Sequence, residues 1–63
     1  MNDLEVLAVE LSTISFLSYD DALCCLSSVK IHGGDCREAI NRYRVGGTNS
    51  LNVYITYLRM ECE

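Results

Sequence analysis

The segment that decides the fold is SYDDALCCLSSVKIHGGDC, residues 18–36. Ser18 and Asp21 have the spacing of a capping box, with Asp in place of the usual Glu or Gln, and mark the start of a helix. The Gly33–Gly34 pair marks its end, because glycine adopts the left-handed conformation that closes many helices. We therefore expect one helix that ends near Lys30. Its inward face is expected to comprise Tyr19, Ala22, Leu23, Cys25, Leu26 and Val29.

A short basic helix is expected directly after this turn. Asp35 is a suitable N-cap, and the Gly46–Gly47 pair stops the helix, which then covers residues 36–44. Its inward face is expected to comprise Cys36, Ala39, Ile40 and Tyr43. Its exposed side is expected to carry Arg37, Asn41 and Arg44. Glu38 and Arg42 are four residues apart, so they can pair on the helix surface.

An amphipathic helix is expected at the N-terminus, over residues 3–16. Its apolar residues recur at helical spacing behind an Asn2 or Asp3 cap and comprise Leu4, Leu7, Leu11 and Ile14. Three further apolar residues, Val6, Val9 and Phe16, fall on other faces. They indicate either a helix that is buried all round or a contact surface for a partner or a second copy.

The C-terminal segment has two interpretations. Residues 53–57, Val-Tyr-Ile-Thr-Tyr, are rich in strand formers and could pair with residues 42–45 across a turn. The alternative is a helix capped by Asn49 or Ser50, and we favour it because five residues share one helical face. These are Leu51, Tyr54, Ile55, Leu58 and Cys62.

The predicted fold is therefore a single all-α domain, residues 1–63, built as a small bundle of three to four short helices. The alternative is an α+β fold with a C-terminal β-hairpin at about residues 42–60. Residues 39–47, followed by 50–58, resemble the end of excisionase-type winged-helix domains. This resemblance covers under half of the chain and lacks the basic wing of that family, so we transfer no function from it.

The charges are distributed unevenly along the chain. Residues 1–29 carry five carboxylates and no Lys or Arg, residues 30–44 sum to +2, and residues 45–63 add −1. This pattern predicts two surfaces of dissimilar charge, and surfaces of that kind usually contact a binding partner. A chain of 63 residues also has a marginal core. Without disulfides or a metal, such a chain is expected to self-associate, and we expect a homo-oligomer.

The chain offers little for metal binding or catalysis. Cys24, Cys25, Cys36, Cys62 and His32 lack a Cys-x-x-Cys motif or a regular zinc spacing, so no metal or other cofactor is expected. Cys25 and His32 are the one pair that could act as nucleophile and general base, and Cys25 cannot act as a nucleophile if it faces the core. We therefore expect no enzyme. The N-terminal residues lack the pattern of a signal peptide, and no membrane segment is evident, so we expect a cytoplasmic protein with reduced thiols.

Two classes of function remain. The first is a small acidic module that binds a protein partner and regulates it, of the kind that a phage or virus uses to inhibit a host protein. Its predicted contact residues are Val6, Val9, Phe16 and Tyr57. The alternative is a helix-turn-helix transcriptional regulator that reads DNA with residues 35–44. Its predicted contact residues are Lys30, Arg37, Asn41, Arg42 and Arg44, although a pI near 4.7 is unusual for a DNA-binding domain.

Overall fold

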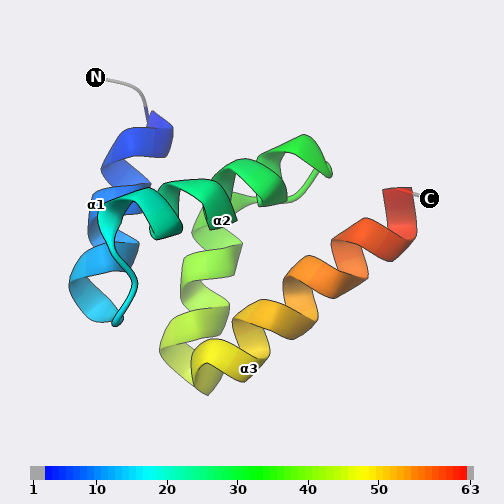
Figure 1. The fold of residues 1–63 in the computed structure, drawn as a ribbon. Helices are drawn as coiled ribbons and strands as arrows, with labels where there is room; N and C mark the ends of the chain where they lie inside the picture. Colours follow the sequence, from blue (N-terminus) through cyan, green and yellow to red (C-terminus); the bar gives the residue numbers. More distant parts are fainter. Residues whose placement is uncertain (1–2, 63) are drawn as a thin grey trace.

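A computed structural model describes residues 3–62, and these residues form three helices with short connections (Figure 1). Helix α1 covers Asp3–Ile14, α2 covers Tyr19–Ile31 and α3 covers Cys36–Cys62. All three helices contact one another, and α2 lies across both α1 and the first part of α3. The prediction of a small helical bundle is confirmed.

The predicted alternative with a C-terminal β-hairpin is wrong, because residues 3–62 contain no strand. The segment rich in strand formers is helical, and its Tyr54 and Ile55 pack against the core between the buried Leu51 and Leu58. Packing of a helical stripe outweighs the intrinsic preference of β-branched residues for strands, which is a weak term. The resemblance to winged-helix domains is not supported either, since a wing requires strands.

Both ends of α2 have the predicted caps. Ser18 has an extended backbone, and its hydroxyl accepts a hydrogen bond of 3.2 Å from the Asp21 amide. At the other end, the Gly34 amide donates to the Val29 carbonyl at 2.8 Å. Gly33 has a φ of 81°, the left-handed conformation that the turn requires.

We predict that Ser18→Ala lowers the free energy of unfolding by about 1 kcal/mol, because an amide at the start of α2 loses its acceptor. Thermal unfolding followed by circular dichroism measures this loss. Ser12→Ala is the matched control, because the Ser12 hydroxyl bonds only the Val9 carbonyl one turn earlier in its own helix. An equal loss in the two variants would show that the cap contributes nothing specific.

Helix α3 is bent at Gly47, where φ is 74° and ψ is −159°. This residue divides α3 into a first arm, residues 36–46, and a second arm, residues 48–62, which run in different directions (Figure 1). The two arms correspond to the two C-terminal helices predicted from the sequence. The Gly46–Gly47 pair was expected to stop the first of them, and Gly47 indeed interrupts the helical conformation.

The core draws on all three helices. Its buried members are Ala8, Leu11, Ala22, Leu26, Val29, Cys36, Ala39, Ile40, Leu51 and Leu58. The predicted inward residues whose side chains the structure describes are buried or half-buried, with one exception, and the side chain of Cys62 lies outside the described part. Tyr19 is 39% exposed, because it is the first residue of α2 and lies beyond the edge of the core. No helix within residues 3–62 has the length and apolar character needed to cross a membrane.

Candidate functional site

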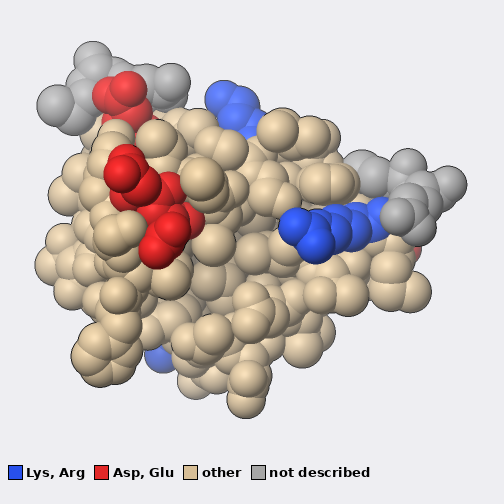
Figure 2. Space-filling model, viewed as in Figure 1, with Lys and Arg blue, Asp and Glu red and all other residues tan. Residues whose placement is uncertain are grey.

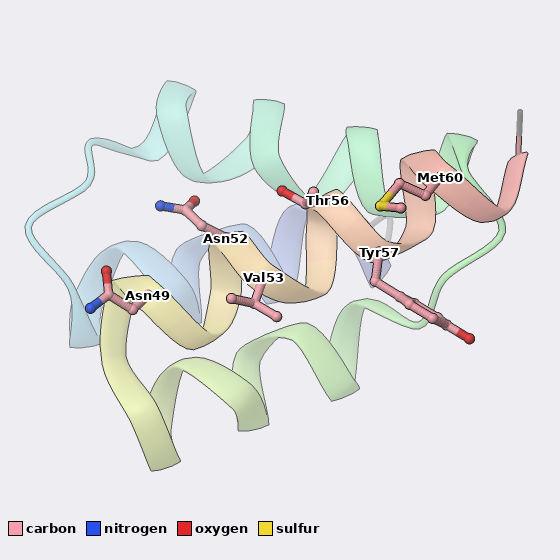
Figure 3. A pocket seen from close by; sticks show the side chains of 6 residues that line it. All are labelled: Asn49, Asn52, Val53, Thr56, Tyr57 and Met60. Atoms are coloured by element: carbon pink, nitrogen blue, oxygen red, sulfur yellow. The ribbon is translucent and has the colours of Figure 1, made fainter.

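The outer side of the second arm of α3 carries a continuous apolar surface. Val53, Tyr57 and Met60 are 66%, 57% and 70% exposed. They line an open groove of about 460 Å³ together with three polar side chains. We call this surface the α3 face, and it consists of Asn49, Asn52, Val53, Thr56, Tyr57 and Met60. Figure 3 shows Val53 at its centre, Tyr57 directed to the side of the first arm, and Asn52 and Thr56 on the side of α2.

The helical repeat explains why these residues are exposed. Leu51 and Leu58 lie seven positions apart and are both buried in the core, so the opposite side of the arm faces solvent. Asn49, Val53, Thr56 and Met60 recur there with spacings of four, three and four residues. That spacing is typical of the seam along which one helix packs on another.

The bend at Gly47 positions the first arm beside this face. The Tyr54 hydroxyl accepts a hydrogen bond of 3.1 Å from the Asp35 amide, and the Arg42 guanidinium lies 5.3 Å from the centre of the Tyr54 ring. A second hollow of about 360 Å³ lies between the arms and is lined by Arg42, Val53, Tyr54 and Tyr57. It shares two residues with the groove, so the apolar surface extends to the first arm.

A guanidinium group lies on each side of the α3 face. Arg42 borders the side of the first arm, and its Nε donates to Glu38 Oε1 at 2.9 Å. Arg59 borders the side of α2, in a hollow that also contains Cys24 and Cys25. Within residues 3–62, Arg59 forms no ion pair. Of the two guanidinium groups beside the face, Arg42 is thus neutralised by Glu38, whereas Arg59 has no carboxylate partner among the described residues.

The four predicted protein-contact residues are all exposed but belong to separate surfaces. Val6 and Val9 lie on α1, and Phe16 lies in the connection between α1 and α2. Phe16 borders a small cavity of about 150 Å³ at the bend of α3, whereas Tyr57 lines the α3 face. Val53 and Met60 were not among the predicted contact residues. The helical repeat nevertheless places them on the same side as Tyr57, and this could have identified them.

The predicted nucleic-acid residues lie largely where the sequence places them. Arg37, Asn41 and Arg44 are exposed on the first arm, and Lys30 is exposed near the end of α2. Carboxylates engage this basic stripe: Arg44 Nη2 donates to Glu10 Oε2 of α1 at 2.9 Å. Figure 2 shows that acidic side chains gather over α1 and the start of α2, apart from the basic ones. Recognition of DNA stays a prediction, and the carboxylates beside these basic residues would repel the DNA phosphates.

Two of the cysteines, Cys25 and Cys36, have the environments expected of unreactive thiols, whereas Cys24 is exposed. Burial raises the pKa of the Cys25 thiol, with Asp21 and Cys24 adding to the effect. Burial also raises the pKa of Cys36, whose Sγ lies 3.3 Å from the Leu26 carbonyl oxygen. A raised pKa leaves less thiolate, the nucleophilic form, at neutral pH. The part of the chain that the structure describes holds no cluster of three or more metal-ligating side chains.

Comparison with known proteins gives no relative from which a function could be transferred. No protein-family model matches the chain, and neither the curated proteins nor the solved structures contain a similar one. The physical character of the α3 face therefore carries the functional argument.

Proposed function

We propose that this protein is a small, non-catalytic module that binds another protein through the α3 face. The observation that carries the proposal is the exposure of Val53, Tyr57 and Met60 on one side of one helix, around a groove of about 460 Å³. Adjacent apolar side chains of this size in water are a common mark of interaction surfaces.

The composition of the face fits protein recognition. Tyr and Met are enriched in the centres of protein interfaces, whereas the rim of an interface is usually polar. Here Val53, Tyr57 and Met60 supply the apolar centre, and Asn49 and Asn52 supply hydrogen-bonding groups at the edge. A helix with this arrangement can accept the apolar side of an amphipathic helix, which is a common mode of recognition.

We predict that Val53→Ser/Tyr57→Ser abolishes capture of the partner when the tagged protein is used for affinity capture from a cell lysate. Loss of two central apolar side chains removes the contacts that contribute most to such interfaces, typically more than 1 kcal/mol each. Mass spectrometry identifies the recovered proteins, and nuclease treatment of a parallel sample removes nucleic acid.

Val45→Ser is the matched control, because Val45 is exposed at the end of the first arm and lies outside the α3 face. It should retain the partner. Undiminished recovery with Val53→Ser/Tyr57→Ser would contradict the proposal. Recovery of nucleic acid that nuclease abolishes, and that Arg37→Ala/Arg44→Ala also abolishes, would favour the DNA-binding alternative.

A further inference from the structure

A second exposed apolar surface lies on α1. Val6 and Val9 are 46% and 52% exposed, and Thr13 follows on the same side of the helix. We call these three residues the α1 face. Glu5 and Glu10 lie to either side of it by the helical repeat, and both are exposed. The α1 face is thus an apolar stripe between carboxylates.

We propose that the α3 face of one molecule binds the α1 face of a second copy, head to tail. This inference rests on the proposed function, because it takes the α3 face as a protein-binding surface and names its partner. The mode is that of an amphipathic helix lying in an apolar groove, in which Val6 and Val9 contact the surface around Val53 and Tyr57.

Charge complementarity favours this pairing. Residues 1–29 have a formal charge of −5, although Glu10 is already paired with Arg44. The α3 face lies between the guanidinium groups of Arg42, which is paired with Glu38, and Arg59. Arg59 forms no ion pair within residues 3–62, so it is available to a carboxylate of an incoming α1. Glu61 lies one turn beyond Tyr57 and is the carboxylate of the second arm that opposes this attraction. Complementary charges of this kind fix the orientation of partners more than they add affinity.

The size of the chain provides an independent argument for a second copy. A 63-residue domain buries only about 60% of the surface that its unfolded chain exposes, and self-association is one of the common ways in which small domains gain stability. Joining the two faces buries both of the apolar surfaces on α1 and α3 at once. Because the two faces differ, a pair of molecules leaves one unused face on each of them, so further copies can add until a ring closes or an open chain grows.

The test uses two variants, each with one damaged face: Val6→Ser/Val9→Ser and Val53→Ser/Tyr57→Ser. Sedimentation velocity should show an assembly for the unchanged protein and monomers for each variant alone. A mixture of the two variants in equal amounts should form a heterodimer, because one retains an intact α3 face and the other an intact α1 face. All four substitutions are at exposed positions, and far-UV circular dichroism confirms that each variant is folded.

Two outcomes would overturn the inference. If Val6→Ser/Val9→Ser assembles like the unchanged protein, the α3 face pairs with something other than the α1 face. If the unchanged protein is monomeric at every soluble concentration, no second copy binds. Neither outcome affects the proposed function, which fails only if capture of a protein partner does not depend on Val53 and Tyr57.

A charge test identifies the chemistry of the occupant. Arg59→Glu and Glu61→Lys change the charge beside the α3 face by equal amounts in opposite directions. If the acidic α1 face is the occupant, its affinity should be about tenfold lower for Arg59→Glu than for the unchanged protein, and higher for Glu61→Lys. A tenfold change in affinity corresponds to about 1.4 kcal/mol. The opposite order would show that the occupant is basic and would exclude α1.

Discussion

Leu26→Ala is expected to remove about half or more of the stability of this protein. Leu26 lies in the middle of α2, is fully buried, and is among the largest side chains that solvent does not reach. Replacing a buried Leu by Ala costs about 2–5 kcal/mol, because the side chain's transfer energy is lost and a cavity remains. A domain of 63 residues has a total stability of about 3–9 kcal/mol, so the loss is comparable to the whole.

Unfolding in urea, followed by circular dichroism at the helical minimum, measures this effect. Ile31→Ala is the control, since Ile31 belongs to the same helix but is exposed at its last position. Its effect should stay within about 0.5 kcal/mol, as for most surface substitutions. A shared unfolding midpoint for the two variants would mean that α2 does not pack through Leu26, and the described core would be wrong.

Local patterns were sufficient for most of the fold because α2 and the first arm of α3 have strong boundary signals. A Ser18 hydroxyl can reach only the amides that immediately follow it, and Gly33 can adopt the left-handed conformation wherever it occurs. Such preferences act within a few residues and therefore appear in the sequence. For the second arm the sequence allowed both a helix and a strand, since its Val, Ile, Thr and Tyr residues also suit a strand.

Contacts between distant parts of the chain could not be predicted from these local patterns. The Arg44–Glu10 ion pair joins residues 34 positions apart and follows from the placement of α1 beside the first arm. The same holds for the Tyr54 hydroxyl and the Asp35 amide, 19 positions apart. The helical repeat could show that Val53, Tyr57 and Met60 share a side. It could not show that the bend would place Arg42 next to them.

Gly47→Ala is expected to lower stability by about 1–3 kcal/mol and to alter the α3 face. With a φ of 74° and a ψ of −159°, Gly47 occupies a region of backbone conformation that is essentially confined to glycine. Apart from the adjacent residues and the backbone of the same helix, no atom lies within 4 Å of the position that a Cβ would take, so the backbone conformation is what opposes the substitution. For a domain of this size, a loss of 1 kcal/mol lowers the melting temperature by about 4–8 °C.

The alternative to strain in Gly47→Ala is a straighter α3, because Ala favours a continuous helix. Straightening would separate Tyr54 from Asp35 and Arg42, and the hollow shared by the two arms would open. The proposed binding surface would then lose the side formed by the first arm. Binding by Gly47→Ala should therefore fall together with its melting temperature.

Val45→Ala separates this effect of the bend from a general response of the segment to alanine. Val45 precedes the bend by two residues and is exposed, so its replacement should leave both the melting temperature and the binding nearly unchanged. If Gly47→Ala also melts at the unchanged temperature, the bend is not required for the fold. If it is destabilised yet binds normally, the α3 face functions through the second arm alone, and Arg42 has no part in recognition.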